Sequence, residues 1–404
     1  MAGPLEGIRV LDFGQFLAGP FGPMLMADLG ADVIKVEPTR GDGMRGTVVG
    51  SFMGCQRGKR NIALDLKTPE GLELAMELVA TADVVHHNMT LGTADKLGLS
   101  YEACKATKAD IIYCNTFMYG PIGPMAHMGG LDPLGQAGAG LEWEQGPVAE
   151  GNPPLWLRYG HGDVASAMPS VTAVLMALWH RNRTGEGQYL WTSLLHGSML
   201  YTYDSYLDAE GNASPRPLLD KEQLGLGALY RLYETPSGWL QLAAVREHHW
   251  AALCGVLRRG DLVEDPRFAT PEAREEHRAE LTELLGSIFA TDLASTWRAK
   301  LLAAGVPAEL SVDMLDGEAF LFDSEFEDLG LITNYDHPIL GNVRQAGNLI
   351  TFAGTPATQE RVTGRVGEDS IEILHELGHD DAEIADLLAK RVTYVPGEDY
   401  PWPV

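Results

Sequence analysis

Residues 8–37 read IRVLDFGQFLAGPFGPMLMADLGADVIKVE, and this stretch indicates the fold more clearly than any other. Its first six residues, IRVLDF, form a short apolar run that is typical of a buried strand. The LMADLG segment further on ends a helical stretch at Gly30, where glycine supplies a left-handed cap. A second apolar run, ADVIKVE at 31–37, predicts the next strand. A strand, a helix and another strand in this order are the start of a parallel sheet.

The same alternation continues down the chain. Thr68 and Pro69 are typical of a helix start, because threonine caps the first turn and proline fits the first helical position. Strands are expected at 83–88 and 110–116, with a helix from Tyr101 between them. A parallel sheet of this kind has helices on both faces and binds ligands beyond the carboxyl ends of its strands. Those ends are expected at residues 14–20, 38–43, 88–91 and 116–120.

The chain has 404 residues, which is more than one typical domain holds. Beyond about residue 220 the pattern changes to mixed strands and helices. We therefore expect an α/β protein whose large domain begins with residues 1–224 and whose smaller α+β domain covers 225–325. The remaining segment, 326–404, contains a predicted hairpin and two short helices, and we expect it to return to the large domain.

Composition narrows the class of protein. The four cysteines lack any CxxC pair and are typical of reduced thiols in a cytosolic protein. No signal peptide or membrane span is expected, so we predict a cytoplasmic protein with no membrane partner. A net charge of -26 argues against nucleic acid as a partner. Residues 1–110 hold 11 Lys+Arg against 14 Asp+Glu, so an anionic ligand is better accommodated there than in the acidic remainder.

Several short motifs receive a structural interpretation. HELGH at 375–379 matches the HExxH zinc pattern, but Gly378 resembles a helix C-cap, so His375 and His379 need not share a face and no metal site is expected. No GxGxxG motif follows IRVLDF, and GxxxxGK[ST] and GxSxG motifs are absent from the sequence. The pairs His86-His87 and His248-His249 are expected to be structural or solvent-facing.

The stretch at 159–188 contains the strongest candidate for chemistry. SVTAVLMALWH at 170–180 predicts a buried helix that Ser166 caps, with Pro169 in the first turn. Asp163 would then lie just ahead of the helix, in a turn flanked by glycine, where the helix dipole would keep its carboxylate ionised. Such an Asp serves either as a carboxylate nucleophile or as a second helix cap.

Taken together, five motifs of the chain resemble the class III CoA-transferase family. They are PLEGIRVLDFGQFLAGPFGPMLMADLGADVIKVE, KRNIALDLKTPEG at 59–71, LGLSYE at 97–102, the GD turn at 162–163 and RTGEGQ at 183–188, and the likeness extends to LGHDDAEIADLLAKRV near the C-terminus. This family resembles formyl-CoA transferase and carnitine CoA-transferase and includes α-methylacyl-CoA racemase. The resemblance implies a Rossmann-like large domain, an interlocked homodimer, coenzyme A or acyl-CoA as substrate, no metal, and Asp163 as the nucleophile.

The resemblance also implies where CoA binds. Gln15 and Ala18 would line the pantetheine or thiol end. Six residues fall at or near the nucleotide-contacting positions of the family: Arg40, Leu64, Lys67, Asn88, Met89 and Lys96. For Lys67 and Lys96 the alternative is ordinary solvated helix charge. Backbone amides at Gly162, Gly225 and Gly227 are candidates for an oxyanion site.

Three departures from the family pattern bear on the cofactor and the reaction. Gln15 replaces a histidine, and Thr90-Leu91 replace an Arg-Pro pair, so one phosphate contact is either lost or supplied by Arg45, Arg57 or Arg60. The polyglycine loop of formyl-CoA transferase has no counterpart, which disfavours oxalate or formate as a substrate.

The expected reaction is transfer of CoA between two carboxylic acids through an aspartyl anhydride and an aspartyl-CoA thioester. Leu131 stands where the racemase branch has a histidine base, with Asp132 next to it, and His127 is a poor substitute, so transfer is favoured over racemisation. An α-methylacyl-CoA racemase and a catalytically silent CoA-binding homologue remain the alternatives. Four aromatic residues are either core residues, the commoner case, or the lining of an acyl pocket that would suit a bulky or partly apolar acid: Trp156, Tyr159, Tyr230 and Tyr233.

Overall fold

The computed structural model describes residues 3–158, 160–313, 320–357 and 361–397. They fall into two compact units, which we call unit 1 and unit 2. Unit 1 takes its residues from Met1–Glu142, Trp156–Tyr203 and Ser324–Val404, and unit 2 from Trp143–Leu155 and Asp204–Asp323. The smaller unit therefore starts about twenty residues before the expected boundary at 225 and includes a short segment from the first half of the chain.

The described part of unit 1 is built around a seven-stranded sheet in the order β13-β3-β2-β1-β4-β5-β6. The strands are β1 (Arg9–Asp12), β2 (Asp32–Glu37), β3 (Arg60–Leu64), β4 (Val84–His87), β5 (Ile112–Phe117), β6 (Tyr189–Ser193) and β13 (Thr393–Tyr394). All neighbours pair in parallel except β13, which runs antiparallel to β3. The strand order reverses between β1 and β4, as in Rossmann-like folds, where ligands bind at this switch point.

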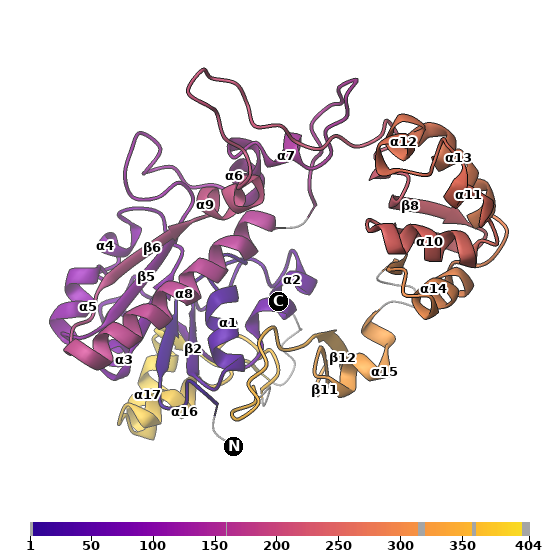
Figure 1. The fold of residues 1–404 in the computed structure, drawn as a ribbon. Coiled ribbons are helices and arrows are strands. Elements are labelled where there is room, and N and C mark those ends of the chain that lie inside the picture. The colour runs from indigo at the N-terminus through magenta and orange to yellow at the C-terminus, as the bar shows by residue number, and fades with distance from the viewer. Residues whose placement is uncertain (1–2, 159, 314–319, 358–360, 398–404) are drawn as a thin grey trace. The chain divides into compact units, whose positions relative to one another are not determined.

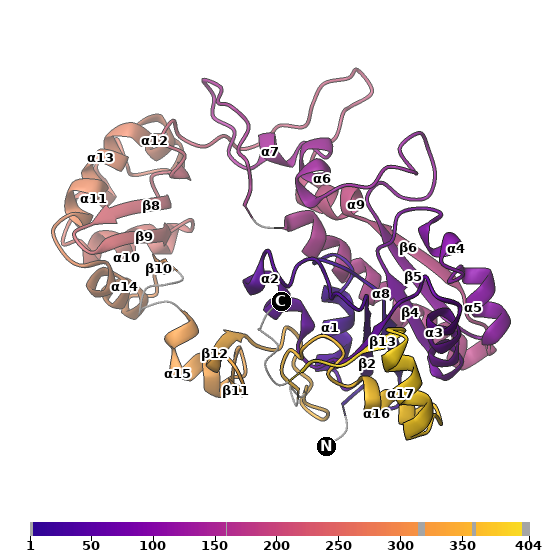
Figure 2. The ribbon, with the colours of Figure 1, turned by 180° about the vertical axis from the view of Figure 1, so that it is seen from behind.

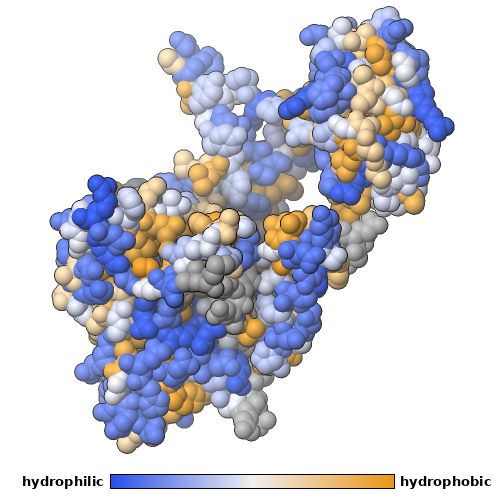
Figure 3. Space-filling view, turned by 60° about the horizontal axis from the view of Figure 1, so that its bottom comes forward, coloured by the Kyte–Doolittle hydropathy of each residue, from blue (hydrophilic) through white to orange (hydrophobic). Residues whose placement is uncertain are grey.

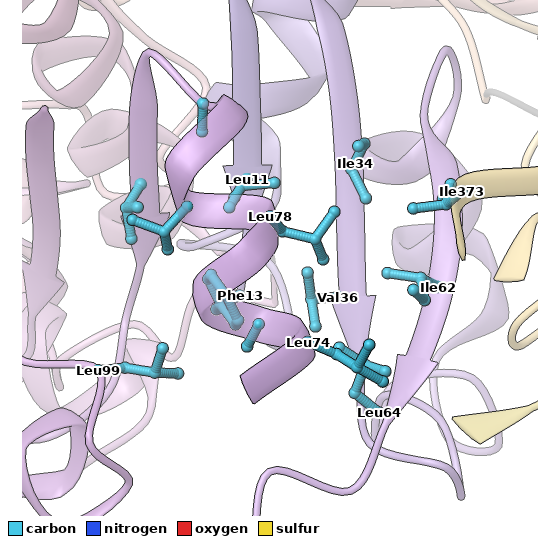
Figure 4. Close-up of a cluster of buried hydrophobic side chains, with 14 of the residues drawn as sticks. Leu11, Phe13, Ile34, Val36, Ile62, Leu64, Leu74, Leu78, Leu99 and Ile373 are labelled. Atoms are coloured by element: carbon cyan, nitrogen blue, oxygen red, sulfur yellow. The ribbon is translucent and has the colours of Figure 1, made fainter. Parts of the chain in front are cut away.

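The strands alternate their side chains between two cores. On β1, Val10 packs with one helix layer and Leu11 with the other, and on β4 Val84 and Val85 divide in the same way. Helices α1 (Phe21–Asp28) and α8 (His161–Thr184) cover one face, which Figure 1 shows in front. The other face is covered by α3 (Pro69–Thr81), α5 (Tyr101–Thr107), α16 (Ser370–Glu376) and α17 (Asp381–Ala389). Figure 2 shows this face, and Figure 4 shows Leu74 and Leu78 of α3 packing on the strands beside Ile373 of α16.

Local sequence signals account for several of these elements. Gly30 has a φ of +93°, the left-handed conformation expected where the first helix ends. Thr68 accepts a hydrogen bond from the Gly71 amide and so caps α3 as predicted. The C-terminal segment returns to unit 1 through β13 and α16, after a hairpin of β11 (Ile332–His337) and β12 (Gly341–Ala346). The remaining elements of this unit are α2 (Val49–Gln56), α4 (Thr93–Lys96), α6 (Asp132–Gly138), α9 (Leu194–Met199), η1 (Leu200–Thr202) and α15 (Ser324–Asp328).

The HELGH segment divides between two helices, as its glycine predicts. Helix α16 ends at Glu376, Gly378 has a φ of +99°, and Asp380 caps α17. His379 bonds to Glu77 through Nε2 at 2.8 Å rather than facing His375. Among the described residues, three or more His, Cys, Asp or Glu side chains nowhere gather in a way that would hold a metal ion. His86, His87 and His249 are buried, and His248 is exposed.

Helix α8 is longer than the sequence predicted. It begins at His161, so Pro169 lies inside it and Ser166, expected as its cap, donates to the Asp163 carbonyl within the helix. By length and composition α8 is able to cross a membrane, which the sequence analysis did not anticipate. Half of its most apolar stretch is buried inside unit 1, where Val171, Val174 and Leu178 join the core, and this packing accounts for the apolar composition.

Unit 2 has a core of its own beneath an antiparallel sheet in the order β10-β9-β8-β7. Its strands are β7 (Gly225–Gly227), β8 (Tyr230–Thr235), β9 (Gly238–Ala243) and β10 (Ala308–Ser311). Its helices are α10 (Glu247–Val256), α11 (Asp261–Glu264), α12 (Pro271–Glu276), α13 (Arg278–Phe289), α14 (Ala294–Ala303) and η2 (Phe320–Phe322), while α7 (Leu141–Glu144) spans the first junction between the units. On the face drawn in Figure 3, hydrophilic residues cover most of the surface and apolar residues form scattered patches.

Candidate active site

Two cavities lie at the carboxyl end of the parallel sheet in unit 1. The first, which we call the Arg40 cavity, has a volume of about 350 Å³. Its walls come from the carboxyl ends of β2 and β3, from the segments that follow β1, β2, β3 and β4, and from the residue after α4: Phe13, Gln15, Val36, Pro38, Thr39, Arg40, Leu64, Asp65, Leu66, Lys67, Met89 and Leu97. Five of the residues assigned to CoA from the resemblance therefore line one cavity: Gln15, Arg40, Leu64, Lys67 and Met89.

Two of the three charged residues that line this cavity are cations, Arg40 and Lys67, and the third is Asp65, so the balance favours an anion. Arg40 and Lys67 both have exposed side chains, and neither forms an ion pair with any carboxylate of the described residues. Leu64 is buried, and with Phe13 and Val36 it provides an apolar wall beneath the two cations. A ligand with a phosphate group and a planar or aliphatic portion fits this division between rim and wall.

The second cavity, the Asp163 cavity, has a volume of about 190 Å³. Asp163 lines it, together with Ala18 and Asn88, two more of the predicted CoA residues. Its other walls are Phe16, Met44, Thr90, Thr116, Phe117, Met118, Ala126, Met128, Gly129, Gly130, Leu131, Asp132, Pro133 and Leu194. Lys96 lines neither cavity and is exposed at the end of α4.

Gln15, which lines the first cavity, and Asn88, which lines the second, are hydrogen-bonded to each other at the switch point of the sheet. The Gln15 amide donates to Asn88 Oδ1 at 2.8 Å, and Asn88 Nδ2 donates back to the Gln15 carbonyl at 2.8 Å. Gly19 must be a glycine here, because a Cβ atom would lie 2.7 Å from Asn88 Oδ1. The loop after β1 therefore contributes to both cavities and is fixed against the loop after β4.

Buried charges hold this loop from below. Asp12 accepts hydrogen bonds from the Gly14 amide and from Lys59 Nζ, and Lys59 also donates to the Pro20 carbonyl at 2.8 Å. Burial alone would raise the pKa of Asp12, but Lys59 and Lys35 outweigh it and lower this pKa, so the carboxylate stays charged. The two ends of the loop are thus tied to one buried ion pair.

Phe16, in the same loop, has an unusual backbone. Its φ is +59°, a left-handed conformation that costs a non-glycine residue about 1–2 kcal/mol. Asp42 compensates by accepting from the Phe16 amide with both carboxylate oxygens at 3.2 Å, and Lys35 contacts Asp42 at 3.2 Å. The strained backbone places the partly exposed Phe16 ring in the wall of the Asp163 cavity.

Asp163 occupies the first turn of α8 and not the turn ahead of it. Its backbone amide, one of the donors that a helix start leaves free, donates to Asp132 Oδ1 at 2.8 Å. Gln136, which like Asp132 belongs to α6, donates to the other oxygen of Asp132. Helix α6 thus holds the start of α8, and with it Asp163, in place. Gly162 leaves room for this contact, since a Cβ there would lie 2.5 Å from Ser198 Oγ.

The electrostatic prediction for Asp163 is wrong. Burial first, and then the negative charge of Asp132, raise the pKa of Asp163 from 3.8 to about 7. The helix dipole that was expected to keep the carboxylate ionised is outweighed by these two effects. Asp132, to which the sequence analysis gave no role, is therefore part of the site, and the Asp-Pro pair at the start of α6 was the only local signal for it.

The arginines expected to replace the lost phosphate contact are used elsewhere. Arg45 is buried against Glu37, and Arg57 pairs with Asp28 at 2.7 Å. Arg60 lies at the amino end of β3, which is the end of the strand away from the two cavities, and there it binds Asp32 and Glu376. None of the three lines either cavity. Each is instead neutralised by a structural carboxylate, which a charge count along the sequence does not reveal.

The aromatic residues expected in an acyl pocket are scattered. Trp156 is exposed, Tyr233 is buried in the core of unit 2 against Phe289, and Tyr230 is half exposed on β8, while Tyr159 lies outside the described residues. Gly225 and Gly227, two of the candidate oxyanion donors, belong to β7 of unit 2. His127 is exposed and does not line the Asp163 cavity, whereas Leu131 does.

Comparisons with known proteins find CoA-transferases and a related solved structure that match most of the chain. The model of CoA-transferase family III matches residues 5–370. A succinyl-CoA:glutarate CoA-transferase of Mus musculus is 29% identical over 403 residues, covering 96% of this chain and 90% of that protein. A Mycobacterium tuberculosis protein named "Probable fatty acyl-CoA transferase" is 33% identical, covering 77% of this chain and 83% of its own length. The crystal structure of a CAIB/BAIF family protein from Brucella suis superposes with a TM-score of 0.81 at 32% identity, covering 93% of this chain and all of the other.

Proposed function

Because the chain belongs to CoA-transferase family III, we propose that it transfers CoA from an acyl-CoA to a second carboxylic acid, with Asp163 as the nucleophile. The single observation that carries the mechanism is the position of Asp163. Its carboxyl group lines a cavity at the switch point of the sheet, next to the cavity that contains the unpaired Arg40 and Lys67. A CoA ester with its phosphates at these cations and its thioester past the Gln15–Asn88 pair would present its acyl carbon to Asp163.

The proposed reaction has four steps. The Asp163 carboxylate attacks the acyl carbon of the donor, the C–S bond breaks, and CoA thiolate leaves a mixed anhydride. The thiolate then attacks the Asp163 carbonyl and releases the donor acid as its carboxylate. The acceptor carboxylate attacks the resulting aspartyl thioester, which forms a second anhydride and frees the thiolate. Attack of the thiolate on the acceptor acyl carbon gives the new acyl-CoA and restores Asp163.

The surroundings of Asp163 favour the first step. Burial and the charge of Asp132 raise the energy of the free carboxylate, and acylation removes its charge, so the unfavourable interaction is relieved as the anhydride forms. Holding both reactants in place contributes up to about 7–11 kcal/mol, which exceeds any gain from tuning one pKa. The apolar walls limit access of water to an anhydride that water would hydrolyse.

The presence of Asp132 near Asp163 raises racemisation as the alternative reaction. Two carboxyl groups line one cavity, and two bases on either side of an acyl α carbon are what racemisation requires. Both oxygens of Asp132, however, already accept hydrogen bonds, one from the Asp163 amide and one from Gln136. Asp132 therefore acts as a positioning residue in our proposal. Exchange of the α proton with deuterium oxide in the absence of any acceptor acid would support the racemase instead.

The direct test is a transfer assay with a donor acyl-CoA and a panel of free acids. Wild-type protein is expected to form a new acyl-CoA only when an acceptor acid is present, and Asp163→Asn is expected to lose this activity. Native activity in Asp163→Asn would overturn the mechanism, and binding of CoA without any turnover would favour the catalytically silent homologue. We also propose an interlocked homodimer in the cytoplasm, which light scattering on the purified protein and localisation of a tagged chain would test.

A further inference from the structure

The histidine pair His86-His87 ends strand β4 at the switch point of the sheet, directly before the turn at 88–89. Both rings are buried, and they have different partners because neighbouring side chains of a strand point to opposite faces. His86 Nε2 lies 3.2 Å from Ser170 Oγ of α8. On the other face, His87 Nε2 lies 2.8 Å from the Tyr113 hydroxyl of β5, and the same ring contacts the turn through Nδ1.

The hydrogen bonds around His87 assign its tautomer. The Met89 amide donates to Nδ1 at 3.1 Å, and since a backbone amide can only donate, Nδ1 carries no proton. The proton of the neutral ring is therefore on Nε2, which donates to the Tyr113 hydroxyl, and this hydroxyl donates to the Leu99 carbonyl at 2.7 Å. Burial lowers the pKa of His87 to about 3, so the ring stays neutral and presents an acceptor to the turn.

The turn that His87 holds borders both cavities. Met89 lines the Arg40 cavity, while Asn88 lines the Asp163 cavity and bonds to the backbone of Gln15. The Met89 carbonyl accepts from Asn115 Nδ2 at 3.3 Å, so both backbone polar groups of Met89 are bound by side chains of the sheet. All of these residues belong to unit 1. The orientation of this one residue therefore sets part of the wall of each cavity.

We propose that His87 is a positioning residue for acyl-CoA, because its Nδ1 holds the Met89 amide and so fixes the turn that borders both cavities. This inference rests on the proposed function, in which CoA occupies the Arg40 cavity. Without an acceptor at Nδ1 the Met89 amide has to turn towards another partner, and the wall that contacts CoA moves with it. Asp163 keeps its place, since its own amide is bound by Asp132. Loss of Nδ1 is therefore expected to weaken CoA binding more than it slows turnover.

The experiment compares two amide side chains at position 87. In His87→Asn the side-chain oxygen lies near the position of Nδ1 and accepts from the Met89 amide. In His87→Gln the longer side chain reaches the position of Nε2, which keeps the Tyr113 contact and leaves the Met89 amide without its acceptor. His87→Gln is expected to raise the Kd for CoA and the KM for acyl-CoA about fivefold, with kcat within about twofold of wild type. His87→Asn is expected to keep all three constants within about twofold.

Tyr113→Phe is the matched control, because it removes the hydroxyl from the buried network and leaves the Nδ1 acceptor in place. Its Kd and KM are expected to stay near wild type even where urea unfolding shows a loss of stability. Equal effects of His87→Asn and His87→Gln would overturn the inference. So would an effect of Tyr113→Phe on Kd as large as that of His87→Gln, since the network would then act through stability alone.

A second measurement uses the wild-type protein and does not depend on how any variant folds. Nitrogen NMR of protein labelled at histidine is expected to show, for His87 at pH 7, a protonated Nε2 and an unprotonated Nδ1. The opposite tautomer or a charged ring would overturn the inference. The Kd for CoA also separates this inference from the proposed function: wild-type protein that binds CoA but transfers it to no acid refutes the proposed function, and the Kd values of the variants still decide the role of His87.

Discussion

Replacing Asp163 with asparagine should stabilise the protein above neutral pH. Wild-type Asp163 has a pKa of about 7 when folded and 3.8 as its ordinary value, so between these values the folded state binds a proton that the unfolded chain does not. The contribution of this group is therefore fully favourable below pH 4 and is lost as the pH rises through 7. The stability of Asp163→Asn lacks this pH dependence, so the variant should become more stable relative to wild type as the pH rises over the same range.

The magnitude follows from the pKa difference. A raised pKa of about 7 against 3.8 corresponds to about 4 kcal/mol, and partial exposure of the side chain reduces this, so we expect about 2–4 kcal/mol at pH 8. Urea unfolding at pH 5, 6.5 and 8, followed by a probe in unit 1, measures the difference. Glu73→Gln, which removes an exposed charge from α3, serves as the matched control. Equal stabilities of Asp163→Asn and wild type at pH 8 would refute the burial argument.

Three further predictions concern the walls of the site and the buried ion pair beneath it. Arg40→Ala should raise KM for acyl-CoA about tenfold with a smaller effect on kcat, and steady-state kinetics at two salt concentrations check this, since loss of a phosphate contact also weakens the salt dependence. Asp132→Asn should move the acidic limb of the kcat/KM profile from about pH 7 to lower pH by up to about one unit, because the charge that raises the pKa of Asp163 is gone; an unmoved limb would contradict the coupling. Lys59→Met should destabilise the chain by about 3–5 kcal/mol in urea unfolding by leaving Asp12 buried without its partner, and adding Asp12→Asn should recover part of the loss.

The first strands and helices were predictable because their signals are local. An apolar run, a helix that ends at Gly30 and a threonine cap before α3 each depend on a few neighbouring residues. Strand β3, in contrast, was not predicted. Its sequence RNIAL begins with Arg60 and Asn61, which are buried only because carboxylates from distant elements, such as Asp32 and Glu37, bind them. When a polar residue is buried because of a tertiary partner, the sequence shows no apolar periodicity from which the strand could be predicted.

The residues of the candidate site also fall into those that the sequence predicted and those that depend on tertiary partners. The resemblance placed Gln15, Arg40 and Lys67 at positions that prove to line one cavity, which periodicity alone does not predict. The start of α8 and the pKa of Asp163 were missed, because both depend on Asp132, thirty-one positions earlier in the chain. A side chain that caps a helix from another element changes where the helix begins and how its acid ionises. Neither effect is visible in the local sequence.

Chemical trapping on Asp163 tests the central claim most directly. Purified protein is incubated with an acyl-CoA at pH 8 without acceptor, treated with hydroxylamine, digested and analysed by mass spectrometry. Our account predicts a hydroxamate on the side chain of Asp163 that forms only when acyl-CoA is present. A protein that transfers CoA normally while the peptide containing Asp163 stays unmodified, or is modified at a different residue, would contradict it.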